Sequence, residues 1–172
     1  MVNYALVGRC GIYCGSCALY RAYKDGGEYL QQMSEKWKMP LEKIRCEGCH
    51  ALTLNCAGNK CKIVRCLNSR GFEYCFECQE YEQHSCKKYE ENAKKCVNYN
   101  VDLRANLERI KAGKVEAWLK ESEEEFRCPK CGKPLPALGW DNKKCYHCDV
   151  GLSKPARARL LGEVLPKRCK RP

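Results

Sequence analysis

Short amphipathic patterns with helical spacing are the clearest signal in the chain. Residues 17–27 show such a pattern, which ends at a pair of glycines, and residues 27–40 show a second one that a proline closes. A third helix is expected through residues 62–70, ending at Gly71, because a glycine is easily accommodated in a left-handed helix cap. The apolar residues of the second pattern share one helical face and are expected to be core: Leu30, Met33 and Trp37.

The longest helical pattern runs from Val101 to Phe126 and contains no cysteine. We expect one connecting amphipathic helix here, relaxed at Gly113. Its acidic end, between Glu121 and Glu125, is interpreted as a solvated helix end, because acid–base catalysis would need a cleft that the pattern does not indicate. The apolar positions recur near helical spacing: Leu103, Leu107, Ile110, Val115, Trp118 and Leu119.

Cysteine is the composition's dominant feature, with 17 residues in a chain of 172. That density is typical of either a secreted disulfide scaffold or thiolate–metal sites in a reducing compartment. The first residues, MVNYALVGRCG, lack a basic segment followed by a long apolar run, so we expect no signal peptide, a cytoplasmic location and metal sites. No segment approaches the ~20 apolar residues that span a bilayer, so no membrane association is expected.

Twelve cysteines precede residue 100, enough for three four-ligand sites. Cysteines in a CxxC pair are expected to share an ion, but the sequence does not decide which of the others do. Three Phe and three Trp give little apolar core, so we expect metal to supply folding energy and the metal-free chain to be largely unfolded. The expected ligands in this part are Cys10, Cys14, Cys17, Cys46, Cys49, Cys56, Cys61, Cys66, Cys75, Cys78, Cys86 and Cys96.

The last cysteine block predicts a zinc ribbon. CPKC is followed by thirteen residues, beginning with Gly132, and then CYHC, so two CxxC knuckles can converge on one ion at ~2.3 Å from each sulfur. Gly132 supplies a permissive backbone just after the first knuckle. Trp140 is expected at the tip of the loop between the knuckles. The predicted zinc ligands are Cys128, Cys131, Cys145 and Cys148.

The formal net charge of +11 treats every cysteine as neutral. Sixteen thiolates in four zinc sites would add sixteen negative charges and four divalent ions would return eight positive ones, which lowers the net charge to +3. The remaining basic excess is local, because residues 151–172 hold seven Lys or Arg and one acid. This tail contains the odd cysteine, Cys169, expected to be a free thiol. The basic tail, together with Trp140 and the basic residues of the ribbon, indicates nucleic acid or protein as a partner. The basic ribbon residues are Arg127, Lys130, Lys133, Lys143 and Lys144.

The first motif, CGIYCGSC, has the CxxxCxxC spacing by which radical S-adenosylmethionine enzymes hold an iron–sulfur cluster. Against that reading, Ser16 stands where such enzymes carry an aromatic residue, and the chain lacks the alternating strands and helices of a barrel. Gly26, Gly27 and Glu28 match a cofactor tripeptide but open a helix, where these residues are ordinary. Three close thiolates still suit a [4Fe-4S] cluster, so zinc and iron–sulfur both stay open for Cys10, Cys14 and Cys17.

Several motifs together resemble one family of small cysteine-rich prokaryotic proteins, domain of unknown function 3795. They are CGIYCGSCALY, CEGC, CKIVRC, GFEYCFECQEY, NLERIKAGKVEAWL and FRCPKCG…CYHC, which extend the resemblance from Cys10 to about Cys148. The family implies metal binding, usually supposed to be zinc, and no established activity. Its members often carry an aromatic–proline pair before the cysteine that matches Cys86. Here His84 and Ser85 stand there, which makes His84 an alternative ligand.

We therefore expect a small, metal-stabilised, mainly α protein with short β-hairpins. Its expected parts are a cysteine-knuckle, metal-binding domain over residues 1–98, a connecting helix over 99–126, a zinc ribbon over 127–150 and a basic tail over 151–172. The expected function is multi-site metal binding, with several zinc ions, by a binding or adaptor module and not a catalyst. The alternative is an iron–sulfur protein, an electron carrier or cluster-dependent enzyme, that uses the CxxxCxxC site.

Overall fold

The structure is a computed structural model that describes residues 3–97, 99, 101–136 and 144–152. It is mainly helical in this part, as expected, with the α-helices α1 (Ala18–Asp25), α2 (Gly27–Trp37), α3 (Lys62–Arg70), α4 (Gln79–Glu82), α5 (Lys87–Val97), α6 (Leu103–Lys111) and α7 (Val115–Glu125). Five 3-10 turns join them: η1 (Tyr4–Leu6), η2 (Cys14–Ser16), η3 (Leu41–Lys43), η4 (Ala57–Lys60) and η5 (Cys75–Glu77). None of the described helices has the length and apolarity needed to cross a membrane.

The described residues form isolated β-bridges in place of the expected short hairpins. Val7 pairs with Tyr13 around the first cysteine motif, and two further bridges, Arg127 with Pro134 and Lys144 with Gly151, flank the last cysteine block. Between those two bridges, residues 137–143, with Trp140, lie outside the described residues.

Glycines end the first helices where the sequence predicts. α1 ends at Gly26 (φ +63°), from which the chain turns directly into α2, so the Gly–Gly–Glu tripeptide is a helix junction. α3 ends at Gly71, whose φ of +71° is left-handed. α2 ends at Trp37, earlier than the proline at position 40, because Lys38 takes the left-handed cap (φ +50°).

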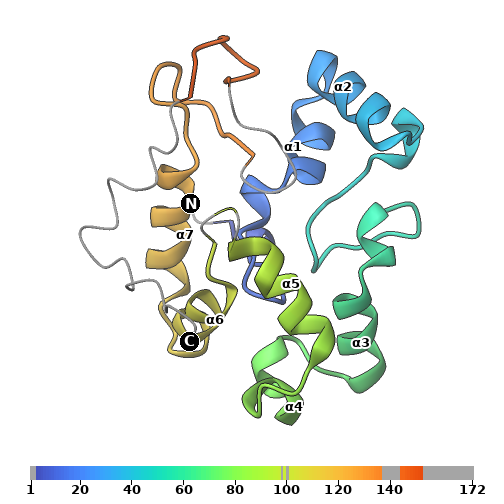
Figure 1. Cartoon of the computed structure of the whole chain (residues 1–172), viewed down its shortest axis with the longest axis vertical. Coiled ribbons are helices and arrows are strands. Elements are labelled where there is room, and N and C mark those ends of the chain that lie inside the picture. The colour runs from blue at the N-terminus through green and yellow to red at the C-terminus, as the bar shows by residue number, and fades with distance from the viewer. Residues whose placement is uncertain (1–2, 98, 100, 137–143, 153–172) are drawn as a thin grey trace, which may run out of the picture.

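The segment expected to be one connecting helix is instead two. α6 ends at Lys111 and is capped by Ala112, Gly113 adopts a left-handed φ of +74°, and α7 begins at Val115. The chain reverses at this turn, and α6 and α7 lie against each other on one side of the molecule (Figure 1). The apolar positions assigned to a single helix, such as Leu107 and Trp118, therefore face a common core from two helices.

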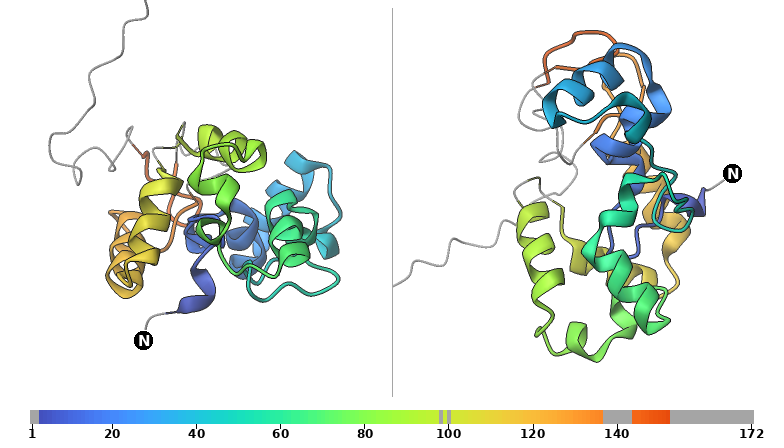
Figure 2. Two further views of the ribbon diagram at one scale, coloured as in Figure 1. Left: turned by 90° about the horizontal axis from the view of Figure 1, so that it is seen from below. Right: turned by 90° about the vertical axis from the view of Figure 1, so that its right-hand side faces the viewer.

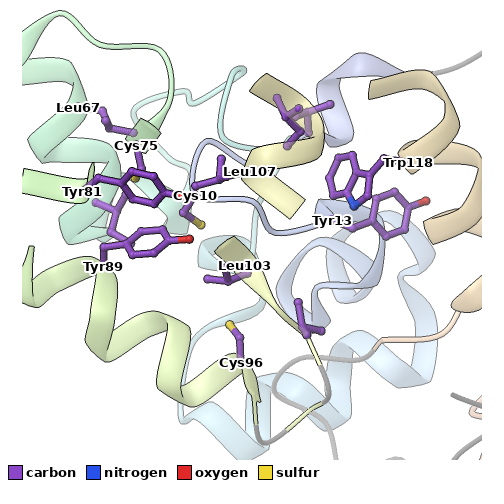
Figure 3. Close-up of a cluster of buried hydrophobic side chains, with 14 of the residues drawn as sticks. Cys10, Tyr13, Leu67, Cys75, Tyr81, Tyr89, Cys96, Leu103, Leu107 and Trp118 are labelled. Carbon is purple, nitrogen blue, oxygen red and sulfur yellow. The ribbon is translucent and has the colours of Figure 1, made fainter. Parts of the chain in front are cut away.

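The first cysteine motif runs through the centre of the largest core. Val7, Cys10 and Tyr13 are buried among residues of α3, α5, α6 and α7 (Figure 3). The ring of Tyr13 meets Trp118 edge-on, with ring centroids 6.3 Å apart. The indole Nε1 of Trp118 donates to Asn106 Oδ1 (3.0 Å), and Asn106 Nδ2 donates to the carbonyl of Gly11 (2.9 Å), so α6 and α7 fasten the motif.

A second core joins the C-terminal segment to the first two helices. Ala18 and Ala22 of α1 pack with Met33 of α2 and Ile44, and Tyr146 packs against this group. The rings of Tyr146 and Tyr29 stack with centroids 3.9 Å apart, and the Tyr146 hydroxyl donates to Asp25. Residues 144–152 accordingly lie beside α1 and α2, although they follow α7 in sequence (Figure 2).

Candidate metal centres

Four cysteines near the C-terminus bring their sulfurs together in the geometry of a single-ion site. The ligand atoms of Cys128, Cys131, Cys145 and Cys148, here called the C-terminal quartet, all lie within 4.8 Å of one another. The Sγ atoms of Cys128 and Cys148 are 3.7 Å apart, and those of Cys131 and Cys145 are 3.8 Å apart. A tetrahedron with metal–sulfur bonds of ~2.3 Å has edges of about 3.8 Å, so the quartet is spaced to bind one metal ion.

The two halves of the quartet have the same backbone construction. The N–H of Cys128 donates to the carbonyl of Lys133 (2.8 Å), while the carbonyl of Cys128 accepts from Gly132 (2.9 Å). Cys145 makes the equivalent bonds, donating to Val150 (2.9 Å) and accepting from Asp149 (2.8 Å). Gly132 and Asp149 hold corresponding positions and both have left-handed φ angles, +68° and +54°. Each CxxC is thus a closed turn whose backbone hydrogen bonds set the positions of its two cysteines.

The quartet's thiols differ in how readily they ionise. Burial opposes ionisation of Cys128, but backbone N–H groups of Cys131 and Lys130 lower its pKa to about 7. Burial raises the pKa of Cys145 to about 12. The Cys128 thiolate is therefore available near neutral pH, whereas Cys145 needs the positive charge of a metal ion to lose its proton.

A second set of cysteines gathers around the first motif and is called the N-terminal group: Cys14, Cys17, Cys46, Cys49 and Cys56. A hydrogen bond between Cys14 and Cys49 is the largest cause of both their shifts, raising the pKa of Cys14 and lowering that of Cys49 to about 7. Burial raises the pKa of Cys46 to about 12, with further contributions from the thiolates of Cys17 and Cys56. Thus CEGC supplies neighbours for Cys14 and Cys17.

Four further cysteines, called the central group, line one cavity: Cys66, Cys75, Cys78 and Cys86. Cys66 lies on α3, Cys75 begins η5, Cys78 precedes α4 and Cys86 precedes α5. Burial raises the pKa of Cys75 to about 12, and the thiolates of Cys86 and Cys66 add to the effect. The predicted pair in CFEC, Cys75 and Cys78, thus lies with one cysteine from each flanking helix region.

Three cysteines expected as ligands have other surroundings. Cys10 is buried and accepts from Asn92 Nδ2 (3.7 Å), and it lies near enough to Cys49, Cys75 and Cys61 for their thiolates to raise its pKa further after burial. Cys61 is exposed at the start of α3. Cys96 is buried beside Leu103 (Figure 3). It lies ten positions after Cys86 along α5, which corresponds to about 15 Å of helix.

Among the other candidates, His84 is not brought to the central cavity. It is exposed, with a left-handed φ of +55° in the turn after α4. Cys169, Trp140, Lys143 and the basic tail from residue 153 onward lie outside the described residues.

Two arginines that the sequence did not single out, Arg9 and Arg70, contact the segments that carry the cysteines of the central group. The buried guanidinium of Arg9 donates to the carbonyls of Glu73 (2.7 Å) and Phe72 and to Asn68 Oδ1 (2.5 Å). The backbone carbonyl of Arg9 accepts from Cys75 (3.0 Å), so this residue ties the first motif to the central group. Arg70 Nη1 donates to Cys78 Sγ (3.2 Å). Arg70 follows Cys66 by four residues on one helix, a spacing that places both on the same face and is visible in the sequence.

The family assignment rests on the part of the chain that contains the N-terminal group and the central group of cysteines. A family model described as "Protein of unknown function (DUF3795)" matches residues 6–91. The chain belongs to this family. The DUF3795 match includes every cysteine of the N-terminal and central groups and ends before α6, so it is shorter than the resemblance drawn from the motifs and leaves out the C-terminal quartet. No curated protein and no solved structure matches the chain.

Proposed function

We propose that this chain is a metal-stabilised binding protein whose C-terminal quartet is a structural zinc ribbon. The observation that carries the proposal is the pair of sulfur–sulfur distances, 3.7 and 3.8 Å, in a set of four cysteines. Four thiolates are a donor set typical of closed structural zinc sites, in which no position is left for substrate. When bound, zinc supplies such a site with folding energy.

The proposed ribbon has a definite task in this fold, which is to dock the C-terminal segment on α1 and α2. Tyr146 lies inside the second CxxC, so the turn that places Cys145 and Cys148 also aims this ring at Tyr29. Its neighbour His147 places Nε2 3.9 Å from an Asp25 carboxylate oxygen. Because the same short turn carries ligands and contacts, ion binding and docking should be coupled.

The test is the metal content of the purified full chain, with Cys145→Ser compared with Cys169→Ser. We expect Cys145→Ser to lose one zinc ion per chain and Cys169→Ser to lose none. Hydrogen exchange should show faster exchange of the amide of Asp149, and of α1, in Cys145→Ser alone. An unchanged zinc content in Cys145→Ser would contradict the proposal, and iron in place of zinc would overturn the identity of the metal.

The partner that we propose for this module is a nucleic acid. The support is the charge distribution: Lys130, Lys133 and Lys144 are exposed around the quartet, and the strongly basic residues 151–172 follow directly. Arg127 is a weaker candidate, because its guanidinium is paired with Glu123 and donates to the carbonyl of Gly132. Lysines that contact phosphates make affinity fall steeply with salt.

This second part is tested by titrating a fluorescent single-stranded RNA, and a DNA of the same sequence, at several salt concentrations. Replacing the three exposed lysines by Gln should reduce the slope of log affinity against log salt by roughly 2, since each single-strand phosphate contact contributes about 0.7. The matched control replaces exposed lysines of the helical part by Gln: Lys43, Lys94 and Lys95. Equal slopes in both variants, or binding to neither nucleic acid, would reject the partner.

A further inference from the structure

The central group differs from the C-terminal quartet because its four cysteines line one partly open cavity and, unlike the quartet, do not bring their sulfurs within 4.8 Å of one another. Figure 3 shows Cys75 beside Leu67 and Tyr81, which also line the cavity. Apart from its cysteines, the lining consists of two basic residues, Arg70 and Lys88, and of apolar or aromatic ones: Ile63, Leu67, Phe72, Tyr81 and Tyr89. Four soft sulfur ligands in an apolar setting favour a thiophilic metal centre.

The spacing of these sulfurs favours a cluster over a single ion. One ion bound at ~2.3 Å needs thiolates about 3.8 Å apart, which the C-terminal quartet provides. Among the described residues, the ligand atoms of the C-terminal quartet lie within 4.8 Å of one another. No three sulfurs of the central group, which is described in full, lie that close together. A cubane cluster binds each thiolate to a different iron, so its four ligands stand further apart around a shared body.

The polar contacts of the cavity suit the charge of such a cluster. Four thiolates around a [4Fe-4S] core of charge +2 leave a net charge of −2. Arg70 Nη1 donates to Cys78 Sγ at 3.2 Å, and the Lys88 side chain lines the same cavity. A second bond from Arg70, to Glu80 Oε1 (2.6 Å), fixes the guanidinium in this position. Hydrogen bonds to cluster sulfurs and an apolar shell are the means by which a protein stabilises a cluster and sets its potential.

Independent helices and turns bring the four cysteines together, and a buried contact supports one of them. The backbone N–H of Cys75 donates to the Arg9 carbonyl (3.0 Å), and hydrogen bonds from the Arg9 side chain to the carbonyls of Phe72 and Glu73 fix the segment just before Cys75. On the other wall, Tyr81 and Tyr89 meet edge-on, with ring centroids 4.7 Å apart. These contacts fix the segment before Cys75 and the two tyrosines that line the cavity.

We propose that Cys66, Cys75, Cys78 and Cys86 bind a [4Fe-4S] cluster in this cavity. The assignment differs from the CxxxCxxC motif that the sequence favours for iron, because Cys14 and Cys17 lie with Cys46, Cys49 and Cys56. It is also independent of the zinc ribbon, so either can fail alone.

The test is anaerobic production of the full chain with iron and sulfide, followed by measurement of iron, acid-labile sulfide, zinc and visible absorption. We expect about four irons and four sulfides per chain in brown protein that also retains the C-terminal zinc. Cys78→Ser and Cys86→Ser should lose most of the iron and the colour. Cys131→Ser, in the C-terminal quartet, is the matched control and should keep both while losing zinc.

A second variant tests the cavity without removing a ligand. Arg70→Gln removes the positive charge beside Cys78 Sγ, so dithionite reduction, which adds one electron to the cluster, becomes less favourable. We expect the iron content to remain and the midpoint potential to become more negative, whereas Arg65→Gln, on the same helix and exposed, should leave it unchanged. Absence of iron from the wild-type chain overturns the proposal. So does iron that Cys78→Ser and Cys86→Ser retain but Cys14→Ser and Cys49→Ser lose, or a potential that Arg70→Gln does not shift.

Discussion

Arg9 is the residue whose removal should most affect the joint between the first cysteine motif and the central group. Its side chain is 9% exposed, and its guanidinium donates three hydrogen bonds, two to carbonyls and one to Asn68. Hydrogen bonds that involve a charged group contribute about 1.5–3 kcal/mol each. Because these acceptors are only partly buried, water can replace some of the lost hydrogen bonds in the variant. Counting two bonds at the lower value gives a loss of roughly 3 kcal/mol in the free energy of unfolding.

The experiment compares Arg9→Met, which keeps the length of the side chain, with Arg65→Met, whose arginine is exposed on α3. In urea unfolding of the metal-loaded chain at fixed metal concentration, the free energy of unfolding should fall by roughly 3 kcal/mol for Arg9→Met, about a hundredfold in the equilibrium constant. The slope with urea should stay the same. If the two variants unfold at the same urea concentration, the three hydrogen bonds do not stabilise the fold and the reasoning is wrong.

Three further perturbations test other contacts of the core. Trp118→Phe removes the hydrogen bond to Asn106 and should lower the free energy of unfolding by about 1 kcal/mol, with Trp37→Phe, partly exposed on α2, as the control. Gly15→Ala adds a Cβ that overlaps the buried ring of Tyr13 and should cost about 1–3 kcal/mol in urea unfolding; wild-type stability would contradict the packing. Alkali should unfold the chain above pH about 10. Burial raises the pKa of three tyrosines in the folded state, whereas the same tyrosines in the unfolded chain ionise near pH 10. The equilibrium therefore shifts toward the unfolded state as the pH rises. Phenolate absorbance and loss of helical circular dichroism should therefore change together, and phenolates that form in a still-helical protein would refute this for Tyr29, Tyr89 and Tyr146.

Local signals predicted local structure well. Gly26 and Gly71 end helices because a residue without Cβ enters the left-handed region at little cost, and this requirement depends on no distant contact. The same reasoning applies to the two CxxC turns of the C-terminal quartet, whose four sulfurs the structure brings together. Each turn is fixed by bonds across six residues, so its geometry follows from its own sequence.

Features that depend on a reversal of the chain could not be predicted from the sequence. A helical repeat of apolar residues from Val101 to Phe126 is compatible with one helix or with two that pack side by side, since both place the same residues on the core. Gly113 decides between them, and a lone glycine within a helical pattern can be tolerated or can end a helix. The partners of Cys14 and Cys17 present the same difficulty, because they come from a loop about thirty residues away whose path depends on the packing of α1 and α2.

The first motif shows how packing and ligation share one short segment. Ser16 is 1% exposed and its hydroxyl donates to the carbonyl of Tyr13 (3.1 Å), so the position before Cys17 is a tight turn with no room for a ring. The aromatic residue of the motif is Tyr13 instead, which stacks on Phe126 with ring centroids 5.9 Å apart. The departure from the radical-enzyme pattern is therefore a packing requirement of this fold: the ring that such an enzyme places before its last cysteine is used here to join the motif to the end of α7.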